Sequence, residues 1–451
     1  MTVPLHQGSV RVAAVCTLVL AACTSHEPAA GPAPRPSGGP PPREWTAESS
    51  GAEIAAWIQQ GCRSDDPCIE RALAGVLGQA GIAKSMEALD SLVLRDPRVR
   101  NSGHALAHGL GISAYRGAET VAATFAGCPT SQMSGCFHGV IQGYFLDLAR
   151  QGRPIGGAEL DALCAPHLDG PRFVLHHCGH GTGHGLMAAH DNHLPAALAS
   201  CDLLSDAFTR ESCYTGAFME NGVQVTHPHH TASGHAQTQG GGHAHGGHAS
   251  SPDDAHAGHG GHHADAQGMV RGEWRALDRD DPLYPCNVVD EKYRQACYGY
   301  QPSPLMFFNG GDVVATARVC QTVPEAFVDA CFGSLGREIT TWASQEHERT
   351  ARMCAGVAEV AAGRAGALCV RGAVETLVQQ SADPQNGLRF CRVVSGAEPR
   401  EECYDRVGTF MVTLYADAEE RARHCAAAEP EFVAVCRRGA EVDRSERRDG
   451  A

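Results

Sequence analysis

The chain alternates between segments that can bury apolar side chains and segments that cannot. Residues 12–22, VAAVCTLVLAA, form an apolar run of the length found in signal peptides, which is too short to span a bilayer. Residues 24–50 are rich in proline and almost free of aliphatic side chains, so they cannot form a core. No other run reaches the roughly 18 apolar residues that a transmembrane helix needs. The pattern predicts a signal peptide at 1–22 and an extended tether at 23–50.

Beyond residue 50, the apolar positions predict pairs of helices. GDVVATARVC followed by PEAFVDACFGSLGREITTWA indicates a short helix that ends near a cysteine, a turn with proline, and a longer helix that carries a second cysteine early. LPAALASC with SDAFTRESCYTGAFMENG repeats this plan, and so does DAEERARHC with PEFVAVCRRGAEV. The folded part is therefore expected to be all-α.

The cysteines show the period of these pairs. Beyond Cys23 there are 18 cysteines, an even number in a chain expected to be exported, which favours disulfides. The chain has no C-x-x-C, so zinc-ribbon, thioredoxin-type and covalent-haem motifs are excluded. The cysteines occur as neighbours at 62/68, 128/136, 164/178, 201/213, 286/297, 320/331, 354/369, 391/403 and 425/436. We expect each pair to form one disulfide.

The spacing of the pairs predicts a repeat array. From Cys128 onward, the first members of successive pairs lie 36, 37, 85, 34, 34, 37 and 34 residues apart, and the longest interval contains a histidine-rich insertion at 226–270. A period of 34–37 residues is typical of helical hairpins. We expect a solenoid of about ten disulfide-stapled hairpins, with N-terminal repeats at 51–225, C-terminal repeats at 271–443 and a disordered tail at 444–451. Each bridge should contribute on the order of 2–3 kcal/mol.

Two parts of the chain resemble known families. Leu20-Ala21-Ala22-Cys23 resembles the lipobox of bacterial lipoproteins, which implies cleavage before Cys23 and attachment of lipid to that cysteine as the only membrane anchor. Thr24 stands where an inner-membrane retention signal would place aspartate, so the resemblance implies an outer-membrane address in a cell that has one. Residues 52–443 are similar in period and cysteine pairing to the cysteine-rich relatives of tetratricopeptide repeats. That similarity implies a concave surface but no reaction.

Charge and motifs narrow the function only slightly. The formal net charge of −15 argues against nucleic acid or an anionic membrane surface as partner. The sequence contains no H-E-x-x-H, no G-x-S-x-G and no G-x-G-x-x-G after a strand. Whether the protein catalyses a reaction stays open.

Histidines distinguish the early repeats from the later ones. When the second helices are aligned on their cysteines, histidine occurs two or six residues after the cysteine in three consecutive units, including the stretch HHCGHGTGHGLM at 176–187. The unit NSGHALAHGLG has no cysteine and aligns with Ser102 in that column. Pairs spaced i, i+4 share a helix face and can reach one ion. The predicted metal ligands are His104, His108, His138, His180 and His184.

The spacing of helices in a solenoid bears on the number of sites. Adjacent helices pack about 8–10 Å apart, so the outermost two of three would be about 20 Å apart unless the array curves tightly. We therefore expect His138, on the middle helix, to decide between one site and two. Cys178 is excluded as a ligand by its expected disulfide. Met187, Met219 and Glu220 could add ligands but are expected to be core or surface residues.

Glycine forms a further column, three residues after the second cysteine. Glycine inside a helix costs about 1 kcal/mol relative to alanine, so we interpret this column as sites of close helix crossing. Its members are Gly139, Gly181, Gly216, Gly372 and Gly439. Glycines next to the histidines should also let helices approach and leave room for an ion; these are Gly109, Gly139, Gly181, Gly183 and Gly185.

The insertion predicts a second kind of metal binding. Residues 227–263 hold eleven histidines among Gly, Ala, Ser and Asp, with no apolar periodicity, which indicates a disordered loop that binds Zn²⁺, Ni²⁺ or Cu²⁺ weakly. Two functions remain. The first is a lipid-anchored envelope protein that binds Zn, Cu or Ni for buffering, delivery or a metal-dependent reaction. The second is a helical scaffold for an envelope protein partner, in which the histidines are incidental.

Overall fold

A computed structural model describes residues 43–117, 121–226 and 274–442. The expected signal peptide, Cys23, most of the tether, the histidine-rich insertion and the C-terminal tail lie outside these residues. Over the described ranges the regular secondary structure consists of helices, without strands. The all-α prediction is confirmed.

The N-terminal helices mostly alternate between short and long elements. They are α1 (Gly51–Cys62), α2 (Asp66–Arg95), α3 (Pro97–Ala114), α4 (Val121–Ala126), α5 (Gly135–Arg150), α6 (Gly157–Cys164), α7 (Arg172–Ala189), α8 (Leu194–Cys201) and α9 (Ala207–Thr226). The 3₁₀ turn η2 (Gln132–Ser134) precedes α5.

The C-terminal helices continue the series after the insertion. They are α11 (Glu291–Tyr298), α12 (Pro302–Phe308), α13 (Val313–Cys320), α14 (Val328–Trp342), α15 (His347–Val360), α16 (Ala365–Ser381), α17 (Pro384–Cys391), α18 (Ala397–Leu414), α19 (Ala418–Cys425) and α20 (Val433–Gly439).

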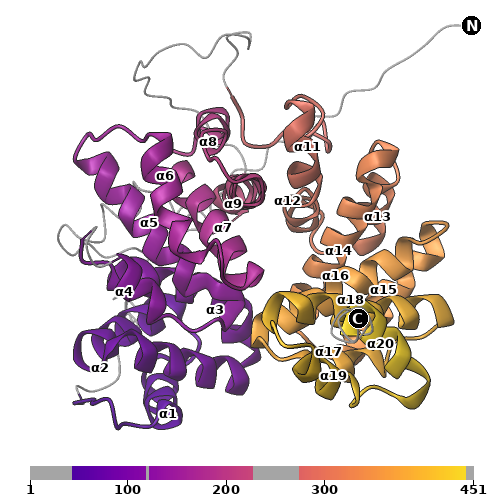
Figure 1. Cartoon of the computed structure of the whole chain (residues 1–451), viewed down its shortest axis with the longest axis horizontal. Helices are drawn as coiled ribbons and strands as arrows, with labels where there is room; N and C mark the ends of the chain where they lie inside the picture. Colours follow the sequence, from indigo (N-terminus) through magenta and orange to yellow (C-terminus); the bar gives the residue numbers. More distant parts are fainter. Residues whose placement is uncertain (1–42, 118–120, 227–273, 443–451) are drawn as a thin grey trace, which may run out of the picture. The chain divides into compact units, whose positions relative to one another are not determined.

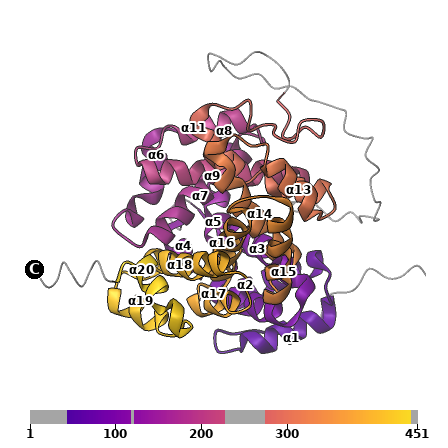
Figure 2. The same ribbon diagram turned by 90° about the vertical axis from the view of Figure 1, so that its right-hand side faces the viewer.

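The long helices of successive hairpins pack side by side, as expected of a solenoid. The order of neighbours is α3, α5, α7 and α9, then α11 and α12, then α14, α16, α18 and α20 (Figures 1 and 2). The two halves of this series also touch. Phe173 of α7 packs with Val378 of α16 and Phe410 of α18, and Arg100 donates a hydrogen bond to the carbonyl oxygen of Ser344 at 2.9 Å. The array therefore curves enough to bring α7 onto the C-terminal repeats.

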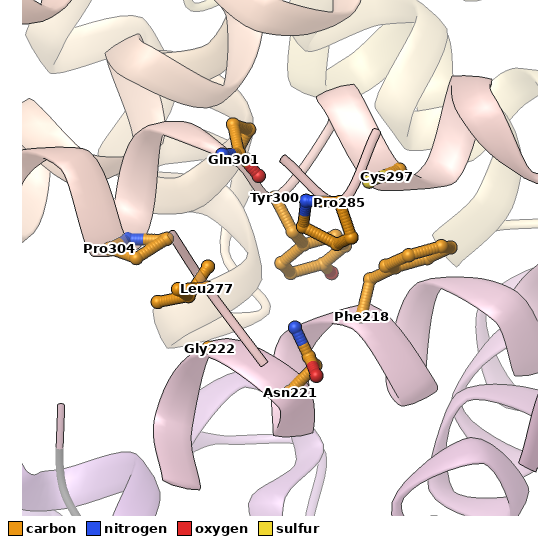
Figure 3. A pocket seen from close by; sticks show the side chains of 9 residues that line it. All are labelled: Phe218, Asn221, Gly222, Leu277, Pro285, Cys297, Tyr300, Gln301 and Pro304. Atoms are coloured by element: carbon orange, nitrogen blue, oxygen red, sulfur yellow. The ribbon is translucent and has the colours of Figure 1, made fainter. Parts of the chain in front are cut away.

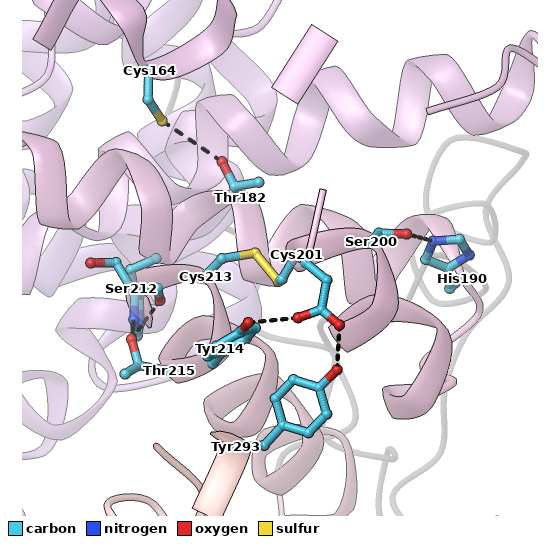
Figure 4. Close-up of a disulfide and its surroundings, with 12 residues drawn as sticks. Cys164, Thr182, His190, Ser200, Cys201, Ser212, Cys213, Tyr214, Thr215 and Tyr293 are labelled. Carbon is cyan, nitrogen blue, oxygen red and sulfur yellow. Dashed lines mark hydrogen bonds between the residues drawn. A yellow bond between two sulfur atoms is a disulfide. The ribbon is translucent and has the colours of Figure 1, made fainter. Parts of the chain in front are cut away.

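Disulfides staple the predicted hairpins, and in two of them, Cys128–Cys136 and Cys286–Cys297, the first cysteine lies in the turn before the second helix. All nine predicted pairs are bonded, with Cα–Cα distances of 5.4–5.8 Å. Figure 4 shows the bridge from Cys201, the last residue of α8, to Cys213 in α9. Beside it, the Asp202 carboxylate accepts hydrogen bonds from the hydroxyls of Tyr214 and Tyr293, the two tyrosines labelled in Figure 4, which ties α8 and α9 to α11.

The unit without cysteines is also a hairpin. Gly81 interrupts α2 with a φ of 84°, so residues 82–95 form a separate helical segment that packs against α3. Asp96 caps α3 by accepting a hydrogen bond from the Arg98 amide. At the other end of the fold, Trp45 lies in the segment expected to be tether. Its side chain is buried against Trp57, so the packed part of the chain begins before Gly51.

The glycine column marks close crossings of helix backbones, as predicted. A Cβ atom added at four of its members would overlap a carbonyl oxygen of the neighbouring long helix. These collisions pair Gly139 with His108, Gly216 with His180, Gly372 with Gly333, and Gly439 with Asp405. Because each contact is made by backbone atoms, a side chain could be accommodated only by moving the helices apart.

Gly372→Ala should therefore lower the free energy of unfolding by about 1–3 kcal/mol, as overpacking of a core does. Gly356→Ala is the matched control, because it also lies within a helix but a Cβ there meets nothing within 4 Å. The control should be neutral or stabilising by up to about 1 kcal/mol. Denaturant unfolding measures both variants. Equal effects of the two substitutions would contradict the close-crossing interpretation.

Candidate metal centre

Three neighbouring helices, α3, α5 and α7, bring the predicted ligands together. His108, His138, His180 and His184 are buried, and His104 is partly buried. Two groups of three histidines have ring nitrogens within 4.8 Å of one another. One group is His104, His108 and His138, and the other is His138, His180 and His184. These buried clusters could hold a metal ion, and His138 belongs to both.

Side chains from the two outer helices, α3 and α7, meet at the cluster. The ring centroids of His108 on α3 and His184 on α7 are 4.9 Å apart. Small residues on both sides of α5 contribute to this close approach. Gly139 lets the α3 and α5 backbones touch, and a Cβ at Gly181 of α7 would lie 3.1 Å from the Cα of His138.

On α7, two hydrogen bonds determine which ring nitrogens face the cluster. The Thr215 hydroxyl donates to the Ser212 carbonyl oxygen at 2.6 Å, so its oxygen accepts from Nδ1 of His180 at 2.7 Å. Ser212 and Thr215 both belong to α9 (Figure 4). The Glu220 carboxylate accepts from Nδ1 of His184 at 2.6 Å. Both rings therefore direct Nε2 toward the cluster.

The two Nε2 atoms of this pair face each other. They are 3.1 Å apart, so both nitrogens lie within reach of a single ion. Two ligands of one tetrahedral zinc ion, each about 2.0–2.1 Å from the metal, would lie roughly 3.3–3.4 Å apart. The pair is therefore already spaced for chelation of one ion.

The histidines of α3 are oriented in the same way. Nδ1 of His104 lies 2.8 Å from the carbonyl oxygen of Gln132, which can only accept, so the lone pair of His104 is on Nε2. Nδ1 of His108 lies 3.4 Å from Oε1 of Gln142, and its Nε2 lies 3.2 Å from Nδ1 of His138. Gln132 belongs to η2, whose three residues have φ angles of 52–56°. This left-handed turn thus supplies an acceptor for the cluster.

Glu220 is the carboxylate of the site. Its side chain is 3% exposed, and Oε1 has no hydrogen-bond partner among the described residues. Within the described ranges, His184 is the only ion-pair partner of Glu220. A buried carboxylate with so few partners is costly unless positive charge lies nearby, which a metal ion on His184 would supply. The sequence had suggested a core or surface role; Glu220 is indeed in the core, as the partner of a predicted ligand, whereas Met187 is an ordinary core residue.

Two further histidines of the stretch HHCGHGTGHGLM join the cluster. Nδ1 of His177 lies 2.9 Å from Nε2 of His138, and the buried Nε2 of His177 has no hydrogen-bond partner in the part of the chain that the structure describes. His176 contacts the Ser212 hydroxyl through Nδ1 at 3.0 Å. The four-residue spacing of His176, His180 and His184 could have identified His176 from sequence. His177 precedes His180 by three residues and His184 by seven, spacings that also place residues on one helix face, so it too could have been identified.

Burial favours the neutral form of three histidines in the cluster, His138, His177 and His180. It lowers the pKa of His138 well below its usual value near 6.5, and the surrounding histidines, His180 first, lower it further. Burial likewise lowers the pKa of His177 and His180 well below the usual value, and neighbouring histidines again contribute. Neutral imidazole is the form that binds metal ions.

The C-terminal repeats place an ion pair, Glu375 with Arg406, near His176 of α7. Glu375 of α16 accepts hydrogen bonds from Arg406 of α18 at 2.8 and 3.2 Å. Burial by itself would raise the pKa of Glu375, but Arg406 and Arg371 outweigh it and the pKa is lowered. The negative charge of Glu375 opposes the effect of burial on His176, whose pKa is nevertheless lowered. Contact between α7 and the C-terminal repeats therefore brings the negative charge of Glu375 close enough to act on His176.

A small pocket lies between α9 and residues 277–304 (Figure 3). Tyr300 lines it, and the ring of the same residue is 6.0 Å from that of His180. The polar side chains of the pocket are engaged by the chain itself. Asn221 donates to the Ala276 carbonyl, and Gln301 donates to the carbonyls of Pro282 and Tyr284. These hydrogen bonds fix residues 276–284, which follow the insertion, against α9 and Gln301.

Comparison with known proteins adds no relative. No family model matches the chain, and no curated protein or solved structure matches it significantly. None of the helices in the described ranges is long and apolar enough to cross a bilayer. The nine disulfides fit an oxidising compartment outside the cytosol.

Without metal, the protein should lose stability as the pH falls below about 6.5. The folded state keeps His138, His177 and His180 neutral, whereas the unfolded chain binds protons on them below that pH. The unfolded state then binds more protons, so acid favours unfolding. Each histidine contributes at most about 1.4 kcal/mol per pH unit. Denaturant unfolding in EDTA between pH 7.5 and 5 tests this. His138→Gln should show a shallower slope, and an unchanged slope would contradict the assignment.

Proposed function

We propose that this protein is a lipid-anchored protein of the cell envelope that binds a divalent transition metal, Zn, Cu or Ni, in the histidine cluster of α3, α5 and α7. The observation that carries the proposal is the orientation of its imidazoles. Two i, i+4 pairs each present Nε2 to the cluster, while every Nδ1 in these pairs is held by an oxygen atom. Metal-binding histidines characteristically have such a partner on the second nitrogen.

An alternative in which these histidines only fill a helix interface accounts less well for the geometry. In the α7 pair, each Nδ1 is bonded to an oxygen atom of α9 and the two Nε2 atoms face each other at 3.1 Å, within reach of one ion. The buried Glu220 carboxylate adds a negative charge that a bound cation would balance. Both features support a metal site over an incidental histidine cluster.

The lipid anchor and the histidine-rich insertion complete the proposal. Lipid attached to Cys23 would hold the helical array near a membrane through the proline-rich tether. The eleven histidines of residues 227–263 would bind the same class of ion weakly and raise its concentration near the cluster. This combination suits buffering or delivery of metal, and it leaves room for a metal-dependent reaction.

Metal content tests the cluster directly. The background for the measurement is the full chain with the eleven insertion histidines changed to asparagine, so that only tightly held metal remains after dialysis. We expect this variant to retain Zn, Cu or Ni by mass spectrometry, and further change of His138, His180 and His184 to alanine to remove most of it. A background variant without tightly held metal, or a triple variant that keeps all of it, would favour the interaction scaffold.

Glu220→Gln should weaken metal binding by about 10–100-fold, because a neutral amide replaces the negatively charged carboxylate that bonds to Nδ1 of His184. Glu211→Gln is the matched control, since Glu211 lies on the same helix but is exposed. Competition with a chelator of known affinity measures both variants in the same background. Equal affinities of the two variants would show that Glu220 does not support a metal ligand.

Cys23→Ala should abolish membrane attachment. A lipoprotein precursor that cannot be acylated remains unprocessed or is mislocalised, which fractionation and the mass of the N-terminal peptide would detect. Ser200→Ala, a change in the folded part, serves as the control. Lipidation would be contradicted if the Cys23→Ala protein were cleaved at the same position and differed in mass from the unmutated protein by the substitution alone.

A further inference from the structure

We propose that the cluster holds two metal ions, one in each group of three histidines, with the imidazole of His138 bridging them. The inference rests on the proposed function, because it presupposes that the cluster binds metal. It goes further in specifying a dinuclear centre and the residue that joins its halves.

The number and arrangement of ligands favour two ions. A tetrahedral ion accepts four ligands, whereas the two groups together offer five histidines, with Glu220 beside them. The groups share only His138. Their other members are oriented independently, the α3 pair by Gln132 and Gln142 and the α7 pair by residues of α9. Each helix thus presents its own chelating pair.

His138 lies between the two pairs and directs a different nitrogen to each side. Its Nδ1 faces His108 of α3 at 3.2 Å, and its Nε2 faces α7, where His177 lies 2.9 Å away. The ring centroid of His138 is 5.1 Å from that of His108 and 4.8 Å from that of His180. One ring nitrogen binds one ion. A histidine common to both groups must therefore use Nδ1 for the α3 ion and Nε2 for the α7 ion.

The charges and protons of this arrangement balance simply. A neutral His138 carries one N–H proton, which passes to solvent when the second ion binds, so the bridging ring becomes an imidazolate with a charge of −1. Together with the Glu220 carboxylate, this charge offsets part of the charge of two ions in a buried site. The bridge would keep the ions roughly 6 Å apart, given metal–nitrogen distances of about 2.0–2.1 Å.

Copper stoichiometry and magnetic coupling test the bridge. The full chain with the insertion histidines changed to asparagine is saturated with Cu²⁺ and dialysed. We expect two Cu per chain, with most of the low-temperature EPR intensity lost relative to copper content, because the imidazolate couples the two spins. One Cu per chain, or two with full EPR intensity, would overturn the bridge and leave the proposed function standing. No retained copper, zinc or nickel would overturn both.

Variants of each half sharpen the result. His104→Ala with His108→Ala, and separately His180→Ala with His184→Ala, should each lower the stoichiometry from two to one and restore the signal of an isolated Cu²⁺. His190→Ala is the control, because His190 lies at the end of α7 outside the cluster, bonded to Ser200. Loss of all copper from either double variant would indicate a single shared site. Circular dichroism shows whether each double variant folds. If one does not, the copper stoichiometry and EPR intensity of the protein with unchanged cluster histidines still decide between a bridged pair and a single ion.

Discussion

The backbone contact between neighbouring long helices is the constraint on which the candidate metal centre depends. Imidazoles are short, so histidines on α3, α5 and α7 can meet only if these helices approach more closely than side-chain packing ordinarily allows. Glycine removes the obstacle. Gly111 and Gly139 let α3 and α5 touch, and Gly183 and Gly216 do the same for α7 and α9. The second contact places Thr215 and Glu220 beside the α7 histidines, so the same crossings that bring the ligands together also supply their hydrogen-bond partners.

Burial of this centre costs free energy, and the disulfides help to offset that cost by restraining the helices that carry it. Several imidazoles and one carboxylate lose water without forming a complete hydrogen-bond network, as the unpartnered atoms of His177 and Glu220 show. The bridges Cys128–Cys136, Cys164–Cys178 and Cys201–Cys213 restrain the helices that carry the cluster and its partners. Each short loop that is closed reduces the entropy of the unfolded chain by an amount worth about 2–3 kcal/mol. Bound metal would add stability of its own.

The repeats are alike in architecture but not in chemistry. The later hairpins keep the disulfide and, in several cases, the close glycine crossing, yet they have no histidine in the two columns. Their contribution is geometric and electrostatic. Phe410 and Val378 pack on Phe173 of α7, and the Glu375–Arg406 pair lies close enough to influence His176. Curvature of the array therefore makes the C-terminal repeats part of the surroundings of a site built on the N-terminal ones.

The sequence by itself determined the helical hairpins, their period, the pairing of cysteines and the five main histidines, because all of these are local or repeat at a fixed interval. Helical spacing was enough to predict that His104 and His108 share a face, as do His180 and His184. It could not predict how far apart α3 and α7 lie, because that depends on curvature summed over several helix contacts. Nor could it establish the roles of Glu220, Thr215 and His177, which arise from neighbours about 35 to 40 residues away in the chain. Tertiary structure decided these, since hydrogen bonds between side chains on different helices form only once the close crossings have set the distance between them.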